Sequence, residues 1–353
     1  MSKKEVKVIT SIIRIKAKDL NTYEKTEKSW KRSKQQFPEI LKIVKLYKSH
    51  KSLNELIDKK DPEFIKGQLG PKKEIQGARI NILPDGKKID KAYSLFAKNL
   101  KVHDQSSDEH WDVLYQNKGG TWAYCYTLDK KLKHSDRKYK KVKQFEKIFP
   151  NLFSNVSKAL DDKNDHLAIP MYTLLKTYMR VGNEIYYKAH KHKGLTTLKK
   201  KDIRIEKDLV TFNYLAKDGV PRKIVIKFPK KYVSRLKSMT KKLNNNDFVF
   251  TNCNTGHPLR DHQFKKAFKN YCGTEFYPHI VRSHYATSTV QNFLKGKRKI
   301  SKEEANQLFL SVAAKLGHKK FIKKENQWKD NYSVTINHYI EPKLVEKVRR
   351  MVR

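Results

Sequence analysis

The spacing of apolar residues changes near residue 137, and this change limits the folds that the chain can adopt. Before it, short strand-like segments are separated by turn signals such as Pro84-Asp85-Gly86. After it, apolar residues recur every three or four positions, which is typical of amphipathic helices. The lysine-rich segment between them, Lys130–Lys143, is predicted as a linker or the beginning of a helix. We therefore expect an α+β fold with a small β-rich N-terminal domain, residues 1–135, and a mainly α-helical domain, residues 136–353.

The second domain is predicted to contain one long buried helix and one β-hairpin. Leu167–His190 carries a single apolar stripe that includes Tyr178 and Ile185. Asp218-Gly219 is a hairpin turn signal between two segments that alternate apolar and polar residues, Leu209–Tyr214 and Arg222–Phe228. Further helices are expected at Phe264–Tyr271, Tyr285–Phe293, Glu303–Leu316 and Lys343–Met351.

The charge of the chain indicates a polyanionic partner. Lysine and arginine number 79 against 36 aspartate and glutamate, which gives a formal net charge of +43. The excess runs through the whole chain, and such a field attracts polyanions and accelerates their capture. We expect a polyanion such as a nucleic acid as the partner, although a solvated lysine-rich surface would show the same composition.

The sequence lacks the features of membrane-spanning, secreted, zinc-binding and nucleotide-binding proteins. No apolar run reaches the roughly 18 residues of a membrane span, and the N-terminal stretch lacks the apolar region of a secretory signal. The three cysteines, Cys125, Cys253 and Cys272, are widely spaced and indicate neither disulfides nor a zinc site. Phosphate-binding glycine motifs for ATP or dinucleotides do not occur. We expect an intracellular, DNA-associated protein without metal or cofactor, whose chemistry comes from side chains.

Cleavage of a DNA strand without a metal needs particular side chains. A tyrosine suits the nucleophile, since its phenolate also leaves readily enough for the step to reverse. Arginine forks suit the non-bridging oxygens on which charge develops, and a lysine can protonate the departing oxygen.

Five short strings occur in one order along the second half of the chain. The first two are Arg180-Val-Gly182-Asn183-Glu184 and Gly194-Leu-Thr-Thr-Leu198. The others are His279-Ile-Val-Arg282, Leu316-Gly-His318 and His338-Tyr339-Ile-Glu-Pro342. Together they resemble the catalytic domain of type IB DNA topoisomerases, of the small viral and bacterial class, which shares its catalytic fold with tyrosine recombinases. Lys193 departs from the pattern, because it stands where the second string usually has a tyrosine.

The resemblance implies a role for several residues. Tyr339 would be the nucleophile that forms a 3′-phosphotyrosine, with Tyr332 as the alternative. Arg180, Arg282 and His318 would hold the phosphate oxygens, and Lys217 at the hairpin turn would be the general acid.

The resemblance also implies DNA contacts and an overall arrangement. Tyr124 and Tyr126 would lie on a strand against DNA, Tyr186 would be a groove contact, and His279 would add a hydrogen bond to the phosphate. The expected arrangement is a C-shaped clamp around duplex DNA, acting as a monomer that relaxes supercoils without ATP or metal. If the chain is viral, it would act in the virion or where viral DNA is made.

Two alternatives stay open. The segment from His279 to Arg282 resembles the H-x-x-R box of tyrosine recombinases equally well, and a site-specific recombinase would use the same cleavage step. A basic DNA-packaging protein without catalysis would explain the charge but not the ordered strings. The lysine-rich stretch Lys319–Asn331 is longer than in small topoisomerases, and it is predicted as a flexible loop or an insertion.

Overall fold

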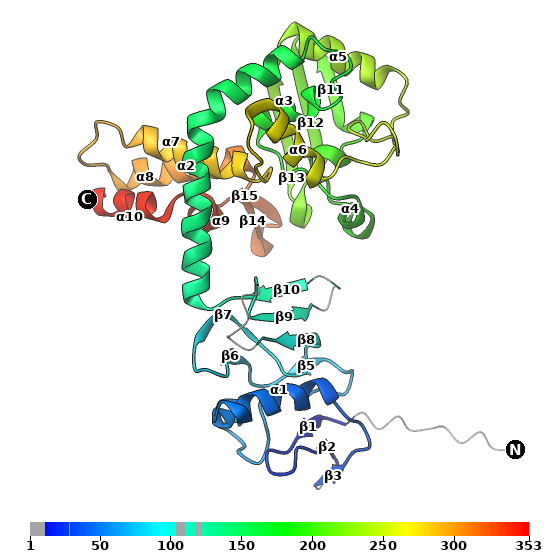
Figure 1. Cartoon of the computed structure of the whole chain (residues 1–353), viewed down its shortest axis with the longest axis vertical. Coiled ribbons are helices and arrows are strands. Elements are labelled where there is room, and N and C mark those ends of the chain that lie inside the picture. The colour runs from blue at the N-terminus through cyan, green and yellow to red at the C-terminus, as the bar shows by residue number, and fades with distance from the viewer. Residues whose placement is uncertain (1–10, 28, 104–109, 118–119, 121, 353) are drawn as a thin grey trace, which may run out of the picture. The chain divides into compact units, whose positions relative to one another are not determined.

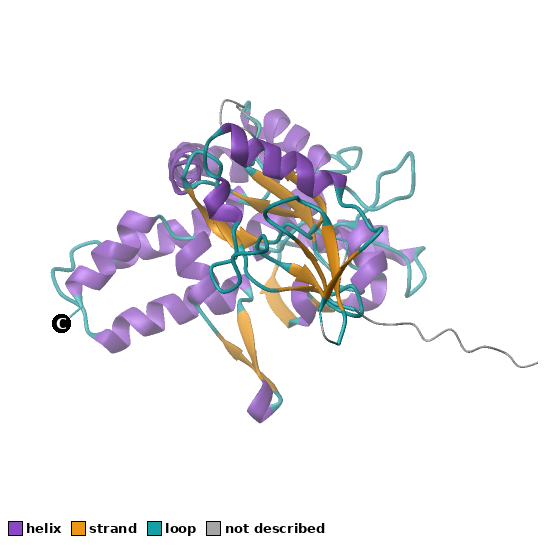
Figure 2. Ribbon diagram, turned by 90° about the horizontal axis from the view of Figure 1, so that it is seen from below, coloured by secondary structure: helices purple, strands orange, loops and turns teal. Residues whose placement is uncertain are grey.

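The computed structural model describes residues 11–27, 29–103, 110–117, 120 and 122–352. The chain divides into two compact units, Met1–Arg137 and Lys138–Arg353. The expected α+β class is confirmed, because small antiparallel sheets dominate the first unit and helices dominate the second (Figures 1 and 2). Residues 1–10 and Thr121, which belong to the expected N-terminal domain, lie outside the described residues.

The first unit packs small sheets and one α-helix around a common core. The sheets have the orders β3-β2-β1-β4-β5, β6-β7 and β10-β9-β8. The strands are β1 (Ile13–Ile15), β2 (Thr22–Lys25), β3 (Trp30–Arg32), β4 (Gln68–Leu69), β5 (Ile75–Gln76), β6 (Ile80–Ile82), β7 (Lys88–Tyr93), β8 (Lys98–Val102), β9 (Val113–Gln116) and β10 (Trp122–Cys125).

Helix α1 (Pro38–Ser49) is followed by the 3-10 turn η1 (Leu53–Leu56). Its buried face carries Ile40, Ile43, Val44 and Tyr47, the spacing of one helical stripe. The Tyr47 hydroxyl donates to the Ile82 carbonyl at 2.6 Å, which ties the helix to β6.

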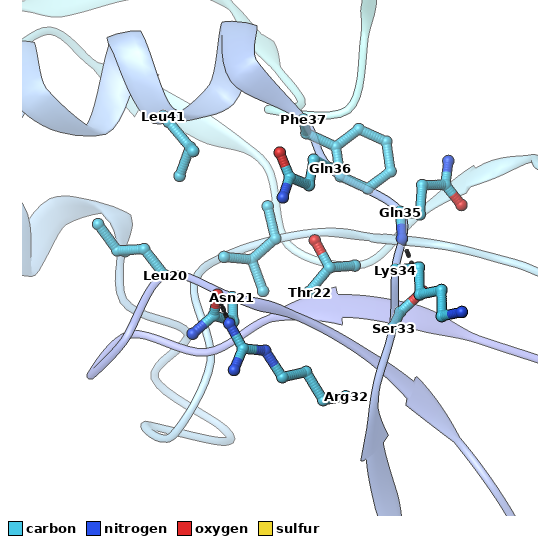
Figure 3. A pocket seen from close by; sticks show the side chains of 11 residues that line it. Leu20, Asn21, Thr22, Arg32, Ser33, Lys34, Gln35, Gln36, Phe37 and Leu41 are labelled. Carbon is cyan, nitrogen blue, oxygen red and sulfur yellow. Dashed lines mark hydrogen bonds between the residues drawn. The ribbon is translucent and has the colours of Figure 1, made fainter.

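A hollow of the first unit opens beside β2, β3 and the beginning of α1 (Figure 3). Its lining mixes polar side chains with Phe37, Leu20 and Leu41. Arg32 and Asn21 are joined there by a 2.9 Å hydrogen bond. None of the residues expected to act on DNA lines this hollow.

The second unit consists of helices around a three-stranded sheet, with a smaller helical group and a separate two-stranded hairpin. Its sheet is β11 (Ile203–Glu206), β12 (Leu209–Leu215) and β13 (Pro221–Lys227), all antiparallel. The helices are α2 (Leu128–Ala159), α3 (Ala168–Thr177), α4 (Glu184–His190), α5 (Lys230–Lys241), α6 (Asp261–Cys272), α7 (Ile280–Phe293), α8 (Lys302–Leu316), α9 (Ser333–His338) and α10 (Pro342–Met351). Short 3-10 turns are η2 (Leu195–Thr197), η3 (Lys200–Asp202), η4 (Lys217–Gly219) and η5 (Lys323–Glu325).

Two hydrophobic clusters hold this unit together. One joins α2, α3, the sheet, α5 and α6. The other joins α7, α8, α9 and α10, which lie side by side in Figures 1 and 2. Tyr178 packs against both clusters, so the segment that carries it lies where the two meet.

Three sequence predictions can be compared with this unit. Of the two alternatives for Lys130–Lys143, the beginning of a helix is confirmed and the linker is wrong, because the segment is part of α2, which begins at Leu128. Leu167–His190 is two helices rather than one, and Ile185 is 79% exposed instead of lining a core. The stretch Lys319–Asn331 folds largely as a β-hairpin, β14 (Lys319–Ile322) and β15 (Gln327–Asp330), rather than a flexible loop.

Candidate active site

Arg180 lies in a non-helical segment between α3 and α4. Helix α3 ends at Tyr178, whose backbone is left-handed with φ of 56°. Helix α4 begins after Asn183, whose side chain accepts a hydrogen bond from the Tyr186 amide at 3.0 Å. Leaving the helix frees the backbone around Arg180 to turn its side chain toward the centre of the unit.

Two glycines fix this segment in place. Gly182 has a φ of 100°, a conformation that L side chains rarely adopt. A Cβ on Gly194 would lie 2.6 Å from the Arg180 carbonyl oxygen and from the Gly182 Cα. The Leu195 amide donates to that same carbonyl at 2.8 Å. The first two sequence strings therefore pack directly on each other, because neither glycine leaves room for a side chain.

Arg282 projects from the first turn of α7 and is 2% exposed. Its guanidinium donates to the carbonyls of Tyr178 and Leu316, the latter at 2.9 Å, and to His318 Nε2 at 3.0 Å. The Nε atom is buried and has no hydrogen-bond partner. A buried arginine donor without an acceptor is costly, so the site lacks one acceptor.

The loop after α8 delivers His318. Gly317 ends the helix with φ of 74°, as helix C-terminal glycines commonly do. Arg222 of β13 donates to the carbonyls of Ala314 and Lys315 at 2.8 and 2.9 Å. These bonds fasten the end of α8 to the sheet, and His318 follows directly.

His318 is a neutral imidazole in this arrangement. Its Nδ1 lies 2.8 Å from the Thr335 hydroxyl and its Nε2 faces the Arg282 guanidinium, which can only donate. The Nδ1 atom therefore carries the hydrogen. Burial, followed by the positive charges of Arg282 and Arg180, lowers the pKa of His318 to about 2.

Tyr339 lies in the break between α9 and α10 and is 4% exposed. Arg180 donates a long hydrogen bond of 3.4 Å to its hydroxyl. The Arg282 guanidinium carbon lies 5.0 Å from the centre of its ring, and the His318 ring centre lies 4.7 Å away. Tyr339, Arg180, Arg282 and His318 thus meet at one point, although up to 159 residues separate them in the chain.

The arginines make the Tyr339 hydroxyl more acidic. Burial alone would raise its pKa, but the positive charges and hydrogen bonds of Arg282 and Arg180 outweigh it, so the pKa falls below the ordinary value. Tyr332 has a different environment. Its hydroxyl donates to Asn306 at 3.0 Å and its ring packs on Phe309.

His279 lies beside Tyr339, with 5.1 Å between their ring centres. Desolvation and, after it, nearby positive charges lower the pKa of His279, and Lys217 is one of those charges. Because His279 as a residue is exposed, we attribute most of that effect to the charges. Lys217 itself lies exposed in the η4 turn, and no hydrogen bond or ion pair to another described residue fixes its side chain.

The residues expected to contact DNA elsewhere are not part of this cluster. Tyr124 belongs to β10 of the first unit and is 39% exposed. Tyr126 follows it, and its ring packs against His134. Tyr186 lies on α4 with its ring 4.5 Å from that of His190.

The cluster is suited to binding an anion. The neighbouring side chains that most affect the pKa of Arg282 are Arg180, Tyr339 and Tyr214, and none of them is a carboxylate. Buried cations without a counter-charge are unfavourable, and a phosphate would supply both that charge and the acceptor that Arg282 Nε lacks. A cavity of about 230 Å³ opens beside Arg180 and His279. Among the described residues no group of three or more His, Cys, Asp or Glu could hold a metal ion.

Sequence reasoning missed two residues of this site. Lys138 lies on α2 with its Nζ 5.7 Å from the centre of the Tyr339 ring. Thr335 binds His318 through its hydroxyl and accepts the Tyr339 amide at its carbonyl. No sequence signal separates Lys138 from the other 78 basic residues, and a buried threonine in a short helix is equally inconspicuous.

Comparisons with known proteins identify the second half of the chain. Residues 128–346 match the family model of the eukaryotic DNA topoisomerase I catalytic core. DNA topoisomerase I of monkeypox virus and DNA topoisomerase 1B of vaccinia virus (strain Copenhagen) are each 29% identical to this chain over 96 residues. That stretch is 27% of this chain and 31%, about a third, of each relative.

Solved structures of lower similarity were also found. The pre-cleavage complex of the XerH site-specific recombinase with its difH substrate aligns with 48% of this chain and 44% of its own, at 18% identity and a TM-score of 0.32. The post-cleavage complex with a palindromic difH substrate aligns at 16% identity and a TM-score of 0.30. No described helix is long and apolar enough to cross a membrane.

Proposed function

Because the chain belongs to the family of the eukaryotic DNA topoisomerase I catalytic core, we propose that it is a type IB topoisomerase that relaxes supercoiled duplex DNA. In this reaction the protein cleaves one strand, lets supercoils escape and rejoins the strand. The reaction needs neither ATP nor a metal, because the phosphotyrosine conserves the energy of the broken bond.

Tyr339 attacks the scissile phosphate in this proposal and forms a 3′-phosphotyrosine. The positive charges of Arg180 and Arg282 favour the phenolate, which supports this choice of nucleophile. The same two side chains hold the non-bridging oxygens as negative charge builds on them. Arg282 Nε, which has no partner in the free protein, donates to one of these oxygens.

His318 can also hold a non-bridging oxygen, but only after its hydrogen bonds change. In the free protein its Nε2 accepts from Arg282 and cannot donate to a phosphate. A bound phosphate attracts the guanidinium and favours a protonated imidazole, since a negative charge raises the pKa of a nearby histidine. His318 then donates from Nε2 while Nδ1 keeps its bond to Thr335.

Lys217 protonates the departing 5′ oxygen. Its exposed position on the η4 turn supports this role, because a side chain that no described partner holds can reach a substrate bound over the site. His279, beside Tyr339, contributes a further hydrogen bond to the phosphate.

The DNA is held by both parts of the chain in this proposal. Residues 1–135 form a DNA-clamping domain, which contacts the duplex through Tyr124 and Tyr126, and residues 136–353 form the catalytic domain, with Tyr186 as a groove contact. The net charge of +43 supports a duplex DNA partner whose affinity falls steeply with salt. The protein acts as a DNA-associated monomer.

The observation that carries the proposal is the meeting of Tyr339 with Arg180, Arg282 and His318 at a site with an unused buried donor. Its test is relaxation of supercoiled plasmid in EDTA without ATP. Wild type and Tyr332→Phe should relax the plasmid and form a covalent complex with DNA, whereas Tyr339→Phe should do neither. Full activity of Tyr339→Phe would show that the nucleophile is another residue.

Failure of wild type to relax DNA that it binds tightly would contradict the topoisomerase proposal. A suicide substrate, in which the cleaved fragment is lost, would then separate the two remaining possibilities. A recombinase would still become trapped on it through a tyrosine, and a packaging protein would not.

A further inference from the structure

The segment that carries Tyr339 is held by hydrogen bonds from two different helices. Residues 338–341 comprise the last residue of α9 and the break before α10, where regular helical hydrogen bonding is interrupted. From α7, the Thr287 hydroxyl donates to the Tyr339 carbonyl and accepts from the Glu341 amide, both at 3.3 Å. From α2, Lys138 donates to the His338 carbonyl and the Tyr139 hydroxyl donates to the Ile340 carbonyl at 2.7 Å.

The α2 contacts bracket the nucleophile on both sides. The two carbonyls that they hold belong to the residues immediately before and after Tyr339. Tyr139 is 6% exposed, and burial lowers the pKa of Lys138 to about 8. Burying a lysine costs free energy of desolvation. Lys138 gains only one hydrogen bond to a carbonyl in return, and no described carboxylate pairs with it, so the need to satisfy a helix end does not by itself explain a lysine here.

We propose that Lys138 and Tyr139 are positioning residues that hold Tyr339 in its attacking conformation. Both act through the backbone of the nucleophile segment rather than on the substrate. The inference rests on the proposed function, because it assigns the pair a task only if Tyr339 attacks a phosphate. A displacement of about 1 Å at such a group costs up to about 100-fold in rate.

The two directions of the reaction should respond differently to loss of this pair. Before cleavage, the Tyr339 hydroxyl must be brought to the phosphorus, and the α2 hydrogen bonds limit its movement. In the covalent intermediate the phosphorus–oxygen bond itself fixes the tyrosine, so the hydrogen bonds matter less. Loss of the pair should therefore slow cleavage much more than religation. Loss of a group that stabilises the transition state, such as Arg282, slows both.

The test uses the full chain and a duplex with a single cleavage site, under single-turnover conditions. The variants are Lys138→Met and Tyr139→Phe, which remove one hydrogen bond each and keep the size of the side chain. Their matched controls are Lys140→Met, exposed on the same helix, and Tyr271→Phe, whose hydroxyl binds Asp165 elsewhere in the second unit. Thermal unfolding and DNA affinity are measured for each variant.

We expect each variant to slow cleavage by about 10- to 100-fold and religation by less than about threefold, with DNA affinity and unfolding temperature close to those of the controls. Lys138→Arg, which keeps a donor, should recover part of the cleavage rate. Equal slowing of both directions, or wild-type cleavage in both variants, would overturn the inference while leaving the proposed function intact. Absence of a covalent complex in wild type would instead overturn the proposed function.

Discussion

The Nε2 atom of His318 accepts a hydrogen bond from the Arg282 guanidinium at 3.0 Å, and both side chains are buried. The bond requires an unprotonated imidazole, in agreement with a His318 pKa lowered from 6.5 to about 2. Below pH 6.5 the histidine is protonated in the unfolded chain, whereas in the folded chain it stays neutral until a much lower pH. The folded state of the second unit therefore becomes less favourable in mild acid.

The first prediction follows from that shift. Between pH 7 and pH 5, His318 should reduce the free energy of unfolding by about 2 kcal/mol. The unfolding temperature of wild type should therefore drop more over this range than that of His318→Gln, measured without DNA. The other histidines whose pKa values are lowered, His134, His279 and His284, are present in both proteins and so cancel in the comparison. An identical pH dependence of the two proteins would contradict a neutral, buried His318.

The second prediction concerns the shape of the Arg282 side chain. Arg282→Lys keeps the charge but cannot serve Tyr178, Leu316 and His318 together. Cleavage and religation should both slow by at least about 100-fold, as for the loss of one preorganised donor at a transition state. DNA affinity should change little, because the site is one of many phosphate contacts.

A matched arginine gives the control for this substitution. Arg204→Lys changes an exposed arginine of β11 that pairs with Glu206, and its cleavage rate should equal that of wild type. The measurement is the single-turnover rate of cleavage and religation for wild type, Arg282→Lys and Arg204→Lys. Arg282→Lys with a wild-type cleavage rate would exclude the fork geometry as the reason for an arginine at this position.

The third prediction tests the role of Lys217. Lys217→Met should slow cleavage of an ordinary phosphodiester by about 100- to 10,000-fold, the usual contribution of a general acid. A substrate with sulfur in place of the departing 5′ oxygen should restore the rate, because a thiolate leaves without protonation. Lys223→Met, exposed on the adjacent strand β13, should behave as wild type on both substrates. Equal defects on both substrates would assign Lys217 to binding rather than proton transfer.

The sequence predicted those elements whose hydrophobic pattern and turn signal agree. The hairpin of β12 and β13 was predicted because Asp218-Gly219 lies between alternating segments, and α8 because a regular stripe fills it. The order of the five strings also predicted which side chains would meet, since Tyr339, Arg180, Arg282 and His318 converge. Their catalytic roles stay predictions.

The errors arose where tertiary contacts override the local pattern. The apolar stripe of α3 continues in phase as far as Ile185, so the hydrophobic pattern predicted one continuous helix and not the break that releases Arg180. The break depends instead on Gly194, which lies twelve residues beyond Gly182 and packs on it. The hairpin of β14 and β15 is mostly polar. Its Phe321 and Trp328 side chains pack on each other, but one aromatic residue in each four-residue strand makes no alternating pattern from which a strand could be predicted.

The fourth prediction concerns that glycine contact. In Gly194→Ala the new Cβ would meet the Arg180 carbonyl and the Gly182 backbone at 2.6 Å, so the Arg180 segment must move. Such overpacking costs about 1–3 kcal/mol of stability. Because Gly194 has no positive φ, the crowding alone causes the effect. Cleavage should slow by more than the stability loss explains, since Arg180 would leave the Tyr339 hydroxyl.

Gly70→Ala is the matched control for this substitution. Gly70 also lacks a positive φ, and the three atoms nearest to a Cβ there belong to the flexible side chains of Glu74 and Gln76. Its unfolding temperature and cleavage rate should stay near those of wild type. If Gly194→Ala lost stability but cleaved DNA at the wild-type rate at a temperature where it is fully folded, the position of Arg180 would not depend on the contact between the two glycines. The close packing of the first two strings would then serve the fold alone.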